Sequence, residues 1–137
     1  MSYLLDTNVI SELRKRDGEP QVKAWAASQN ATDLHISVIT ALEIELGILR
    51  KRRTDPAQAD ALDRWFKQSV LTGFANRILP LDLEAAHRTA PLHVPDKAPQ
   101  HDALIAGTAL AQGLTVATRN VADFHAMGVA VINPWEY

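Results

Sequence analysis

Residues 3–15 have the sequence YLLDTNVISELRK, in which an apolar run leads into a helical pattern. The apolar run at 3–5 is short enough for a buried strand, and apolar residues then recur at helical spacing from about Val9 to Lys15. Three polar residues, Asp-Thr-Asn, lie between the two patterns. A strand that leads directly into a helix is the first part of a βαβ unit, so we expect a sheet whose strands are joined by helices.

The same alternation continues to the end of the chain. Further strands are predicted at 34–36, 77–81, 114–117 and 129–132. Helices are predicted at about 22–27, 38–53, 57–71, 83–89 and 100–111, with Ser37 as an N-cap. Strands separated by helices of this length require right-handed crossovers, which cover both faces of a parallel sheet. The predicted fold class is therefore α/β: a three-layer α/β/α sandwich with a central parallel sheet, in one domain over residues 1–137.

The composition excludes several kinds of chemistry. The chain has 137 residues, 47% of them apolar and 22% charged, which is ordinary for a globular protein. It contains no cysteine, which excludes disulfides, cysteine-bound metals and a thiol nucleophile, so any metal must bind oxygen or imidazole. No apolar run reaches the roughly 20 residues of a membrane span, and Asp6 comes too early for a signal peptide. We expect a cytoplasmic protein with no membrane partner.

Positive charge is concentrated in two runs. The formal net charge is -2, from 14 Lys and Arg against 16 Asp and Glu, and a chain so balanced lacks a general basic surplus for nucleic acid. Seven of the 14 positive charges nevertheless fall at 14–16 and 50–53. Basic residues in the last turn of a helix complement its dipole, and this structural explanation competes with nucleic-acid binding.

Four acidic residues, Asp6, Glu43, Asp102 and Asp123, fall at or near one edge of the predicted sheet. Ligands of open parallel sheets bind at this edge, outside the carboxyl ends of the strands. Carboxylates that converge there repel one another unless a cation neutralises them, and an all-oxygen set without cysteine suits Mg²⁺ or Mn²⁺. Such a metal activates water, so the pattern indicates hydrolysis of a phosphodiester.

Each acid also has a purely structural explanation. Asp6 is placed to cap the helix that follows it, and Thr40 with Glu43 matches a capping box. Asp102 and Asp123 fall in the first turns of predicted helices, where a carboxylate interacts favourably with the helix dipole. Capping explains each acid separately but does not require four carboxylates. Helix N-termini lie at the same edge as the expected site, so position alone does not separate the two explanations.

Glu43 and Glu45 compete for the place in the cleft, because two positions along a helix differ by about 200° in direction. Glu43 shares its side of the helix with polar or small residues, and Glu45 shares its side with apolar ones. We therefore assign Glu43 to the site and Glu45 to an interface.

Two other side chains are interpreted without a role in the site. His101 precedes Asp102, but the five histidines show no zinc-binding spacing, so His101 is interpreted as an exposed residue at a helix end. Trp135 follows the last predicted strand and is interpreted as facing the core or a partner.

Four segments, taken in order, resemble one known family. They are LLDTNVISELRK at 4–15, SVITALEIELGILR at 37–50, HDALIAGTALAQGLTVATRNVADF at 101–124 and VINPW at 131–135. Together they resemble the PIN-domain ribonucleases, specifically the VapC-type toxins of type II toxin–antitoxin systems and their FitB-like branch. The resemblance implies an α/β/α sandwich and Mg²⁺- or Mn²⁺-dependent endoribonuclease activity. It also implies a homodimer, and a cognate VapB-like antitoxin that inhibits the enzyme and binds operator DNA on behalf of the complex.

The resemblance also implies roles for particular residues. The acidic quartet of the family, which is catalytic and binds metal, falls on Asp6, Glu43, Asp102 and Asp123. The polar residues that orient the acids or the scissile phosphate fall on Asn8, Thr118 and Asn120. Arg119 either contacts RNA or pairs with an acid. The sequence departs from the commonest family wording at Gly107, where alanine is frequent, and at His101.

The leading hypothesis is a toxic, metal-dependent endoribonuclease that hydrolyses RNA phosphodiester bonds and is inhibited by its antitoxin. An alternative is a PIN subunit with little nuclease activity, which acts mainly in a DNA-binding toxin–antitoxin complex. A phosphatase with Asp6 as nucleophile is weaker, because the motif is DTN where such chemistry favours DxD.

Overall fold

The computed structural model describes all residues from Met1 to Tyr137. At its centre is a five-stranded sheet in the order β3-β2-β1-β4-β5. The strands are β1 (Tyr3–Leu5), β2 (Leu34–Ser37), β3 (Ile78–Leu79), β4 (Thr115–Ala117) and β5 (Val131–Ile132). Every neighbouring pair is parallel. The first strand of the chain therefore occupies the middle of the sheet, between β2 and β4.

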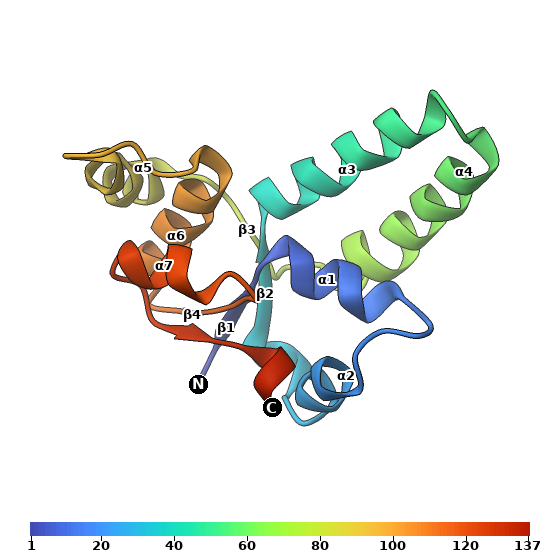
Figure 1. The fold of residues 1–137 in the computed structure, drawn as a ribbon, viewed down its shortest axis with the longest axis horizontal. Helices are drawn as coiled ribbons and strands as arrows, with labels where there is room; N and C mark the ends of the chain where they lie inside the picture. The colour runs from blue at the N-terminus through green and yellow to red at the C-terminus, as the bar shows by residue number, and fades with distance from the viewer.

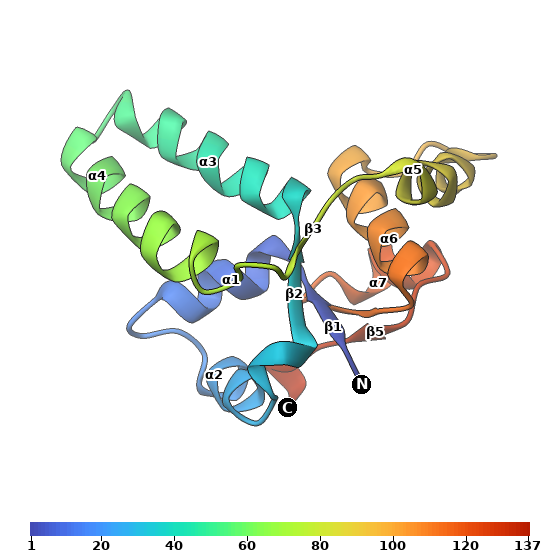
Figure 2. The same cartoon turned by 180° about the vertical axis from the view of Figure 1, so that it is seen from behind.

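Seven helices surround this sheet (Figures 1 and 2). They are α1 (Thr7–Arg14), α2 (Pro20–Ala27), α3 (Val38–Arg52), α4 (Pro56–Trp65), α5 (Leu83–Thr89), α6 (Gln100–Gln112) and α7 (Val121–Ala126). Helices α3 and α4 form a hairpin that extends away from the sheet, while α5, α6 and α7 gather on the other side (Figure 1). None of the helices is both long enough and apolar enough to cross a lipid bilayer.

Two hydrophobic clusters lie on opposite faces of the sheet. In β1, Tyr3 and Leu5 belong to the cluster formed with α1 to α4, whereas Leu4 belongs to the cluster formed with α6 and α7. The same alternation occurs in β4, where Ala117 faces the first cluster and Val116 the second. Successive side chains of a strand point to opposite faces, so both faces are buried under helices. The predicted three-layer α/β/α sandwich with a parallel sheet is confirmed.

Several element boundaries differ from the predicted ones. The helix predicted over 57–71 is α-helical to Trp65 and continues as a π-helical segment over Phe66–Leu71, where Thr72 N–H donates to the Lys67 carbonyl five residues earlier. The strands predicted at 77–81 and 129–132 shrink to two residues each. Pro80 follows β3 and has no N–H with which to extend the ladder.

The position at which α3 starts tests the capping-box explanation for Glu43. The Ser37 hydroxyl accepts a hydrogen bond of 2.8 Å from Ile39 N–H, which confirms Ser37 as the N-cap. The capping box proposed for Thr40 and Glu43 is therefore wrong. With Thr40 as N-cap the helix would begin at residue 41, whereas α3 begins at Val38. Glu43 lies in the second turn of α3 and is available to the cleft.

Candidate active site

Asp6 and Thr118 occupy equivalent places at the carboxyl ends of two neighbouring strands. Leu5 and Ala117 are paired in the parallel register of β1 and β4, so the next residue of each strand leaves the sheet at the same point. The Thr118 hydroxyl donates to Oδ2 of Asp6 at 2.7 Å, and Thr7 N–H donates to Oδ1 at 2.8 Å. Asp6 thus caps α1 and also points its carboxylate into the site.

Burial makes the Asp6 carboxylate unusual. Asp6 is only 4% exposed. Its pKa is raised from 3.8 to about 6, chiefly because burial disfavours the charged form. Hydrogen bonds from Thr118 and Thr7 oppose this increase, whereas the negative charges of Asp102 and Glu43 add to it. Asp6, Asp102 and Glu43 are therefore close enough to repel one another.

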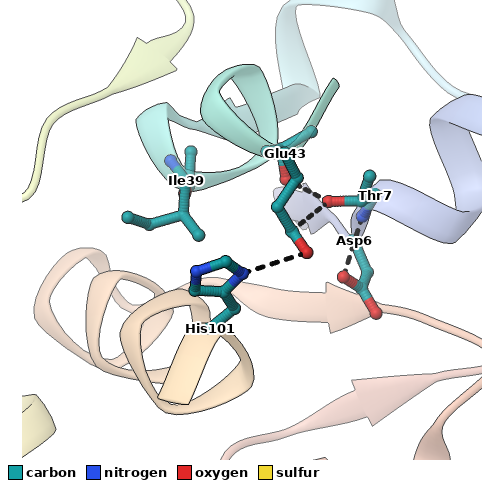
Figure 3. A network of polar contacts seen from close by, with 7 residues as sticks. Asp6, Thr7, Ile39, Glu43 and His101 are labelled. Carbon is teal, nitrogen blue, oxygen red and sulfur yellow. Dashed lines mark hydrogen bonds and ion pairs between the residues drawn. The ribbon is translucent and has the colours of Figure 1, made fainter. Parts of the chain in front are cut away.

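Glu43 reaches the site from α3 and is held by Thr7 (Figure 3). The Thr7 hydroxyl lies 2.7 Å from Oε1 of Glu43 and 3.0 Å from the Thr40 hydroxyl. A hydroxyl carries one proton, and an ionised carboxylate can only accept, so Thr7 donates to Glu43 and Thr40 donates to Thr7. Thr40 is fully buried, which anchors the chain of hydrogen bonds in the protein interior.

Asp102 enters from the first turn of α6, on the opposite side of the cleft. Its pKa is raised, first by burial and then by the charges of Asp123 and Glu43. The preceding residue, His101, is exposed as predicted, but its Nδ1 also lies 3.3 Å from Oε2 of Glu43 (Figure 3). Glu43 is therefore contacted from both walls, by Thr7 of α1 and by His101 of α6.

An open cleft of about 440 Å³ contains three of the four predicted acids, Asp6, Glu43 and Asp102. Asn8 and Asn120 also line it. Thr118 lies behind Asp6, fully buried, and its hydroxyl accepts from Asn120 N–H at 2.9 Å. The structure therefore brings Asn8, Thr118 and Asn120 next to these acids.

Asp123 is placed differently. It is exposed on α7 and lines a neighbouring hollow with Met127, although its charge raises the pKa of Asp102. No three acidic or histidine side chains approach closely enough to hold one metal ion between them. The acids thus share an edge without forming a closed cluster.

The donor set nevertheless fits Mg²⁺ or Mn²⁺. Mg²⁺ usually keeps several waters and binds through one or two carboxylates, so it does not need a closed group of three protein ligands. Asp6 and Asp102 both carry raised pKa values because of burial and the charges of neighbouring carboxylates, and a divalent cation would relieve that repulsion.

Three lining residues, Thr7, Lys15 and Trp135, were not assigned to the cleft from the sequence. Arg119, for which the resemblance left contact with RNA or with an acid open, lines it too. Lys15 belongs to the first basic run, and its ammonium lies 3.4 Å from Glu12. The position of Arg119 next to Thr118 is the signal that could have placed it there.

The second basic run is only partly directed to this region. Lys51 lines a hollow that adjoins the cleft through Glu43, and Arg14 lines the same hollow from the first run. Arg52 instead forms an ion pair of 2.6 Å with Asp60 in α4. Glu45 lies away from the cleft, among apolar residues of α3 that include Leu42 and Leu49, as predicted.

This geometry defines an α/β/α sandwich with an acidic cleft at the carboxyl ends of its central strands. The family model of the PIN domain matches residues 3–129. The chain belongs to the PIN-domain family, which confirms the resemblance drawn from the four sequence segments.

Individual relatives match nearly the whole chain. It is 39% identical to the VapC ribonuclease Y4jK of Sinorhizobium fredii over 142 positions, covering 97% of each chain. It is 39% identical to the toxin FitB of Neisseria gonorrhoeae over 139 positions, covering 96% of this chain and 97% of FitB. The solved structure of FitAB bound to a DNA fragment gives a TM-score of 0.88 at 37% identity, covering 97% of this chain and 95% of that one.

Proposed function

We propose that this protein is the toxin of a toxin–antitoxin pair and hydrolyses RNA phosphodiester bonds as a metal-dependent endoribonuclease. The observation that carries the proposal is the buried Asp6 carboxylate, whose raised pKa reflects burial and the nearby charges of Asp102 and Glu43. Relatives named as a ribonuclease and as a toxin, at 39% identity over nearly the whole chain, support the same assignment.

The metal would be Mg²⁺ or Mn²⁺. Asp6 and Asp102 would be its most direct ligands, and Glu43 and Asp123 would complete the site or order its waters. When bound, the ion supplies positive charge that activates water and stabilises the charge developing on the phosphoryl group.

The remaining residues have definite tasks in this scheme. Thr118 and Thr7 fix the orientation of the Asp6 carboxylate, and Thr7 also directs Glu43 into the cleft. Asn8 and Asn120 line the cleft as neutral donors, so they can orient the scissile phosphate without adding negative charge. Attack of water on phosphorus, in line with the departing ribose 3′ oxygen, leaves a 5′ phosphate on the product.

The test is cleavage of RNA by the purified protein in Mg²⁺ or Mn²⁺. We expect cleavage that EDTA abolishes and that Asp6→Asn and Asp102→Asn each reduce by at least about a hundredfold. Asp33→Asn is the matched control, because Asp33 precedes β2 and so lies at the opposite edge of the sheet. Equal cleavage by the wild type and both cleft variants would reveal a contaminant or a different mechanism.

We further propose a VapB-like antitoxin as partner, homodimerisation, and binding of operator DNA only through the antitoxin, all in the cytoplasm. The similarity to FitB as found in FitAB bound to DNA supports this assignment. The same observation favours the alternative function, a PIN subunit with little nuclease activity that serves the DNA-binding complex. The two are separated by measuring RNA degradation by the free chain and DNA mobility shift by the complex.

A further inference from the structure

We propose that Arg119 binds a phosphate of the substrate strand at the mouth of the cleft, and that Trp135 is the positioning residue that holds its guanidinium. This inference deepens the proposed function and rests on it, because the strand in question is the RNA substrate of that site.

Arg119 is a cation whose hydrogen-bonding capacity is unused. It is exposed, it follows Thr118 directly, and it lines the cleft. No carboxylate lies within 4.0 Å of its guanidinium, and the side chain makes no hydrogen bond. Its only recorded polar contact is through the backbone, whose N–H donates to Oδ1 of Asn8 at 3.5 Å.

Three other arginines use their guanidinium groups in contacts within the fold. Arg52 and Arg88 form ion pairs with carboxylates, and Arg77 donates to the backbone carbonyls of Ala31, Leu34 and Gly73. Arg119 differs because its fork of donors faces a cleft, and a guanidinium fork matches the oxygens of a phosphate.

Trp135 supplies a support that leaves those donors free. The Arg119 guanidinium carbon lies 5.4 Å from the centroid of the Trp135 ring. A cation above an aromatic face is attracted without using its N–H groups, so stacking fixes the guanidinium and still allows it to bind phosphate.

The indole itself is firmly placed. Trp135 lies in the short 3-10 turn Pro134–Glu136, where its backbone N–H donates to Oδ1 of Asn133 at 3.0 Å. This turn packs against α2 (Figure 1), and Trp135 packs against the core cluster formed with α1 to α4. The indole nitrogen is buried without a partner, so packing rather than a polar bond orients the ring.

Arg119 is the one cation lining the acidic cleft that has no carboxylate partner. Asp6, Glu43 and Asp102 repel an incoming phosphate, and Lys15, the other cation of the lining, is paired with Glu12 at 3.4 Å. Arg119 also contributes to lowering the pKa of Glu12, after the Glu19 N–H and Lys15, so its positive field extends across this wall. An RNA strand would therefore meet Arg119 as its unpaired positive contact.

The test measures binding of a fluorescent single-stranded RNA oligonucleotide by anisotropy in EDTA, where no cleavage occurs, at several salt concentrations. Arg119→Gln is expected to weaken binding roughly tenfold and to reduce the slope of log affinity against log salt by about 0.7, the value for one phosphate contact on a single strand. Arg88→Gln removes the same charge from α5, away from the cleft, and is expected to change neither quantity.

A double-mutant cycle tests the role of Trp135. Trp135→Leu should weaken binding about as much as Arg119→Gln, and the double variant should lose little more, because both changes remove the same contact. Trp135→Phe keeps an aromatic face and should retain most of the affinity. Thermal unfolding of each variant shows whether a loss of RNA affinity comes from misfolding. If Trp135→Leu is misfolded, Trp135→Phe replaces it in the double-mutant cycle.

The outcomes separate this inference from the proposed function. Unchanged affinity and salt slope in Arg119→Gln would overturn the phosphate contact, as would an absence of RNA binding by the wild type. Fully additive losses in the double variant would overturn the positioning role of Trp135. If the wild type binds RNA through Arg119 but does not cleave it in Mg²⁺ or Mn²⁺, the endoribonuclease proposal fails and the subsite stands. With cleavage present, Arg119→Gln should raise KM and leave kcat within about twofold.

Discussion

The buried Thr118 hydroxyl donates a hydrogen bond of 2.7 Å to the Asp6 carboxylate, which is itself almost entirely buried. The two residues are neighbours because β1 and β4 are paired in register up to Leu5 and Ala117. This bond partly offsets the effect of burial on the pKa of Asp6. It therefore favours the ionised form of Asp6 and contributes to the stability of the fold.

Replacing Thr118 with valine keeps the shape and removes the donor. Oδ2 of Asp6 loses its hydrogen bond, and Asn120 N–H loses its acceptor. We expect Thr118→Val to raise the pKa of Asp6 further and to lower the free energy of unfolding by about 1–3 kcal/mol at pH 7. Urea unfolding and NMR titration of the Asp6 carboxyl measure the two effects. Thr115→Val in the same strand is the control, and an equal loss there would contradict a specific role for Thr118.

Asp6→Asn is expected to stabilise the protein while abolishing cleavage. A pKa of about 6 against an ordinary value of 3.8 corresponds to roughly 3 kcal/mol of cost for the charged form at neutral pH. Asparagine removes that cost and can still accept from Thr7 N–H, so we expect a gain of about 1–3 kcal/mol at pH 7. Chemical denaturation of the metal-free protein tests this, and a less stable Asp6→Asn would show that the charge is not the dominant cost.

The pH dependence of stability follows from the same carboxyl. Between pH 3.8 and about 6 the folded state binds more protons at Asp6 than the unfolded state does, because its folded pKa is the higher one. The contribution of Asp6 to the free energy of unfolding must therefore fall as pH rises through this window and stay constant above it. Unfolding in EDTA from pH 3.5 to 8 should show the wild type losing stability relative to Asp6→Asn across that range. A constant difference between the two proteins would refute the elevated pKa.

Divalent metal should stabilise the folded chain if it binds at this cleft. Mg²⁺ or Mn²⁺ at about 100 times its Kd is expected to add about 2.7 kcal/mol to the free energy of unfolding, which appears as a higher Tm. Asp102→Asn should lose most of that increase, and Asp33→Asn should keep it. Removal of the metal with EDTA should restore the original Tm of the wild type.

Two helical glycines should respond in opposite directions to alanine. A Cβ on Gly107 of α6 would overlap the Thr89 hydroxyl and lie 2.9 Å from the Ala85 carbonyl oxygen of α5, whereas a Cβ on Gly47 of α3 would meet nothing within 4 Å. We expect Gly107→Ala to cost about 1–3 kcal/mol through overpacking. Gly47→Ala should gain about 0.5–1 kcal/mol from helix propensity. Thermal unfolding of the two variants side by side decides this, and the expectation fails if both shift in one direction.

The Gly107 contact also explains why this chain has glycine where alanine is frequent in the family, which the sequence alone left unexplained. The small residue lets α6 approach α5, with the Thr89 hydroxyl donating to the Ala85 carbonyl at 2.7 Å beside it. Contacts between helices depend on how two elements cross, and a single strand–helix pattern carries no such information.

The strand–helix alternation was sufficient to predict the layers and the edge at which the acids gather. Asp6 and Thr118 could be placed together because both follow parallel strands. The lengths of β3 and β5 could not be predicted, because the ends of a strand depend on which neighbouring strand supplies its hydrogen bonds. Equally, the contact between Thr7 and Glu43 depends on the relative placement of α1 and α3.

The central position of β1 has a consequence for how the protein is made. Asp6 accepts a hydrogen bond from a donor that lies 112 residues later in the chain, and β1 needs β4 as its second neighbour in the sheet. Because synthesis starts at the N-terminus, both partners are made more than 100 residues after β1. A nascent chain, or a product of interrupted translation that stops before β4, therefore cannot assemble the acidic cleft. The candidate active site can therefore form only after β4 and Thr118 have emerged from the ribosome.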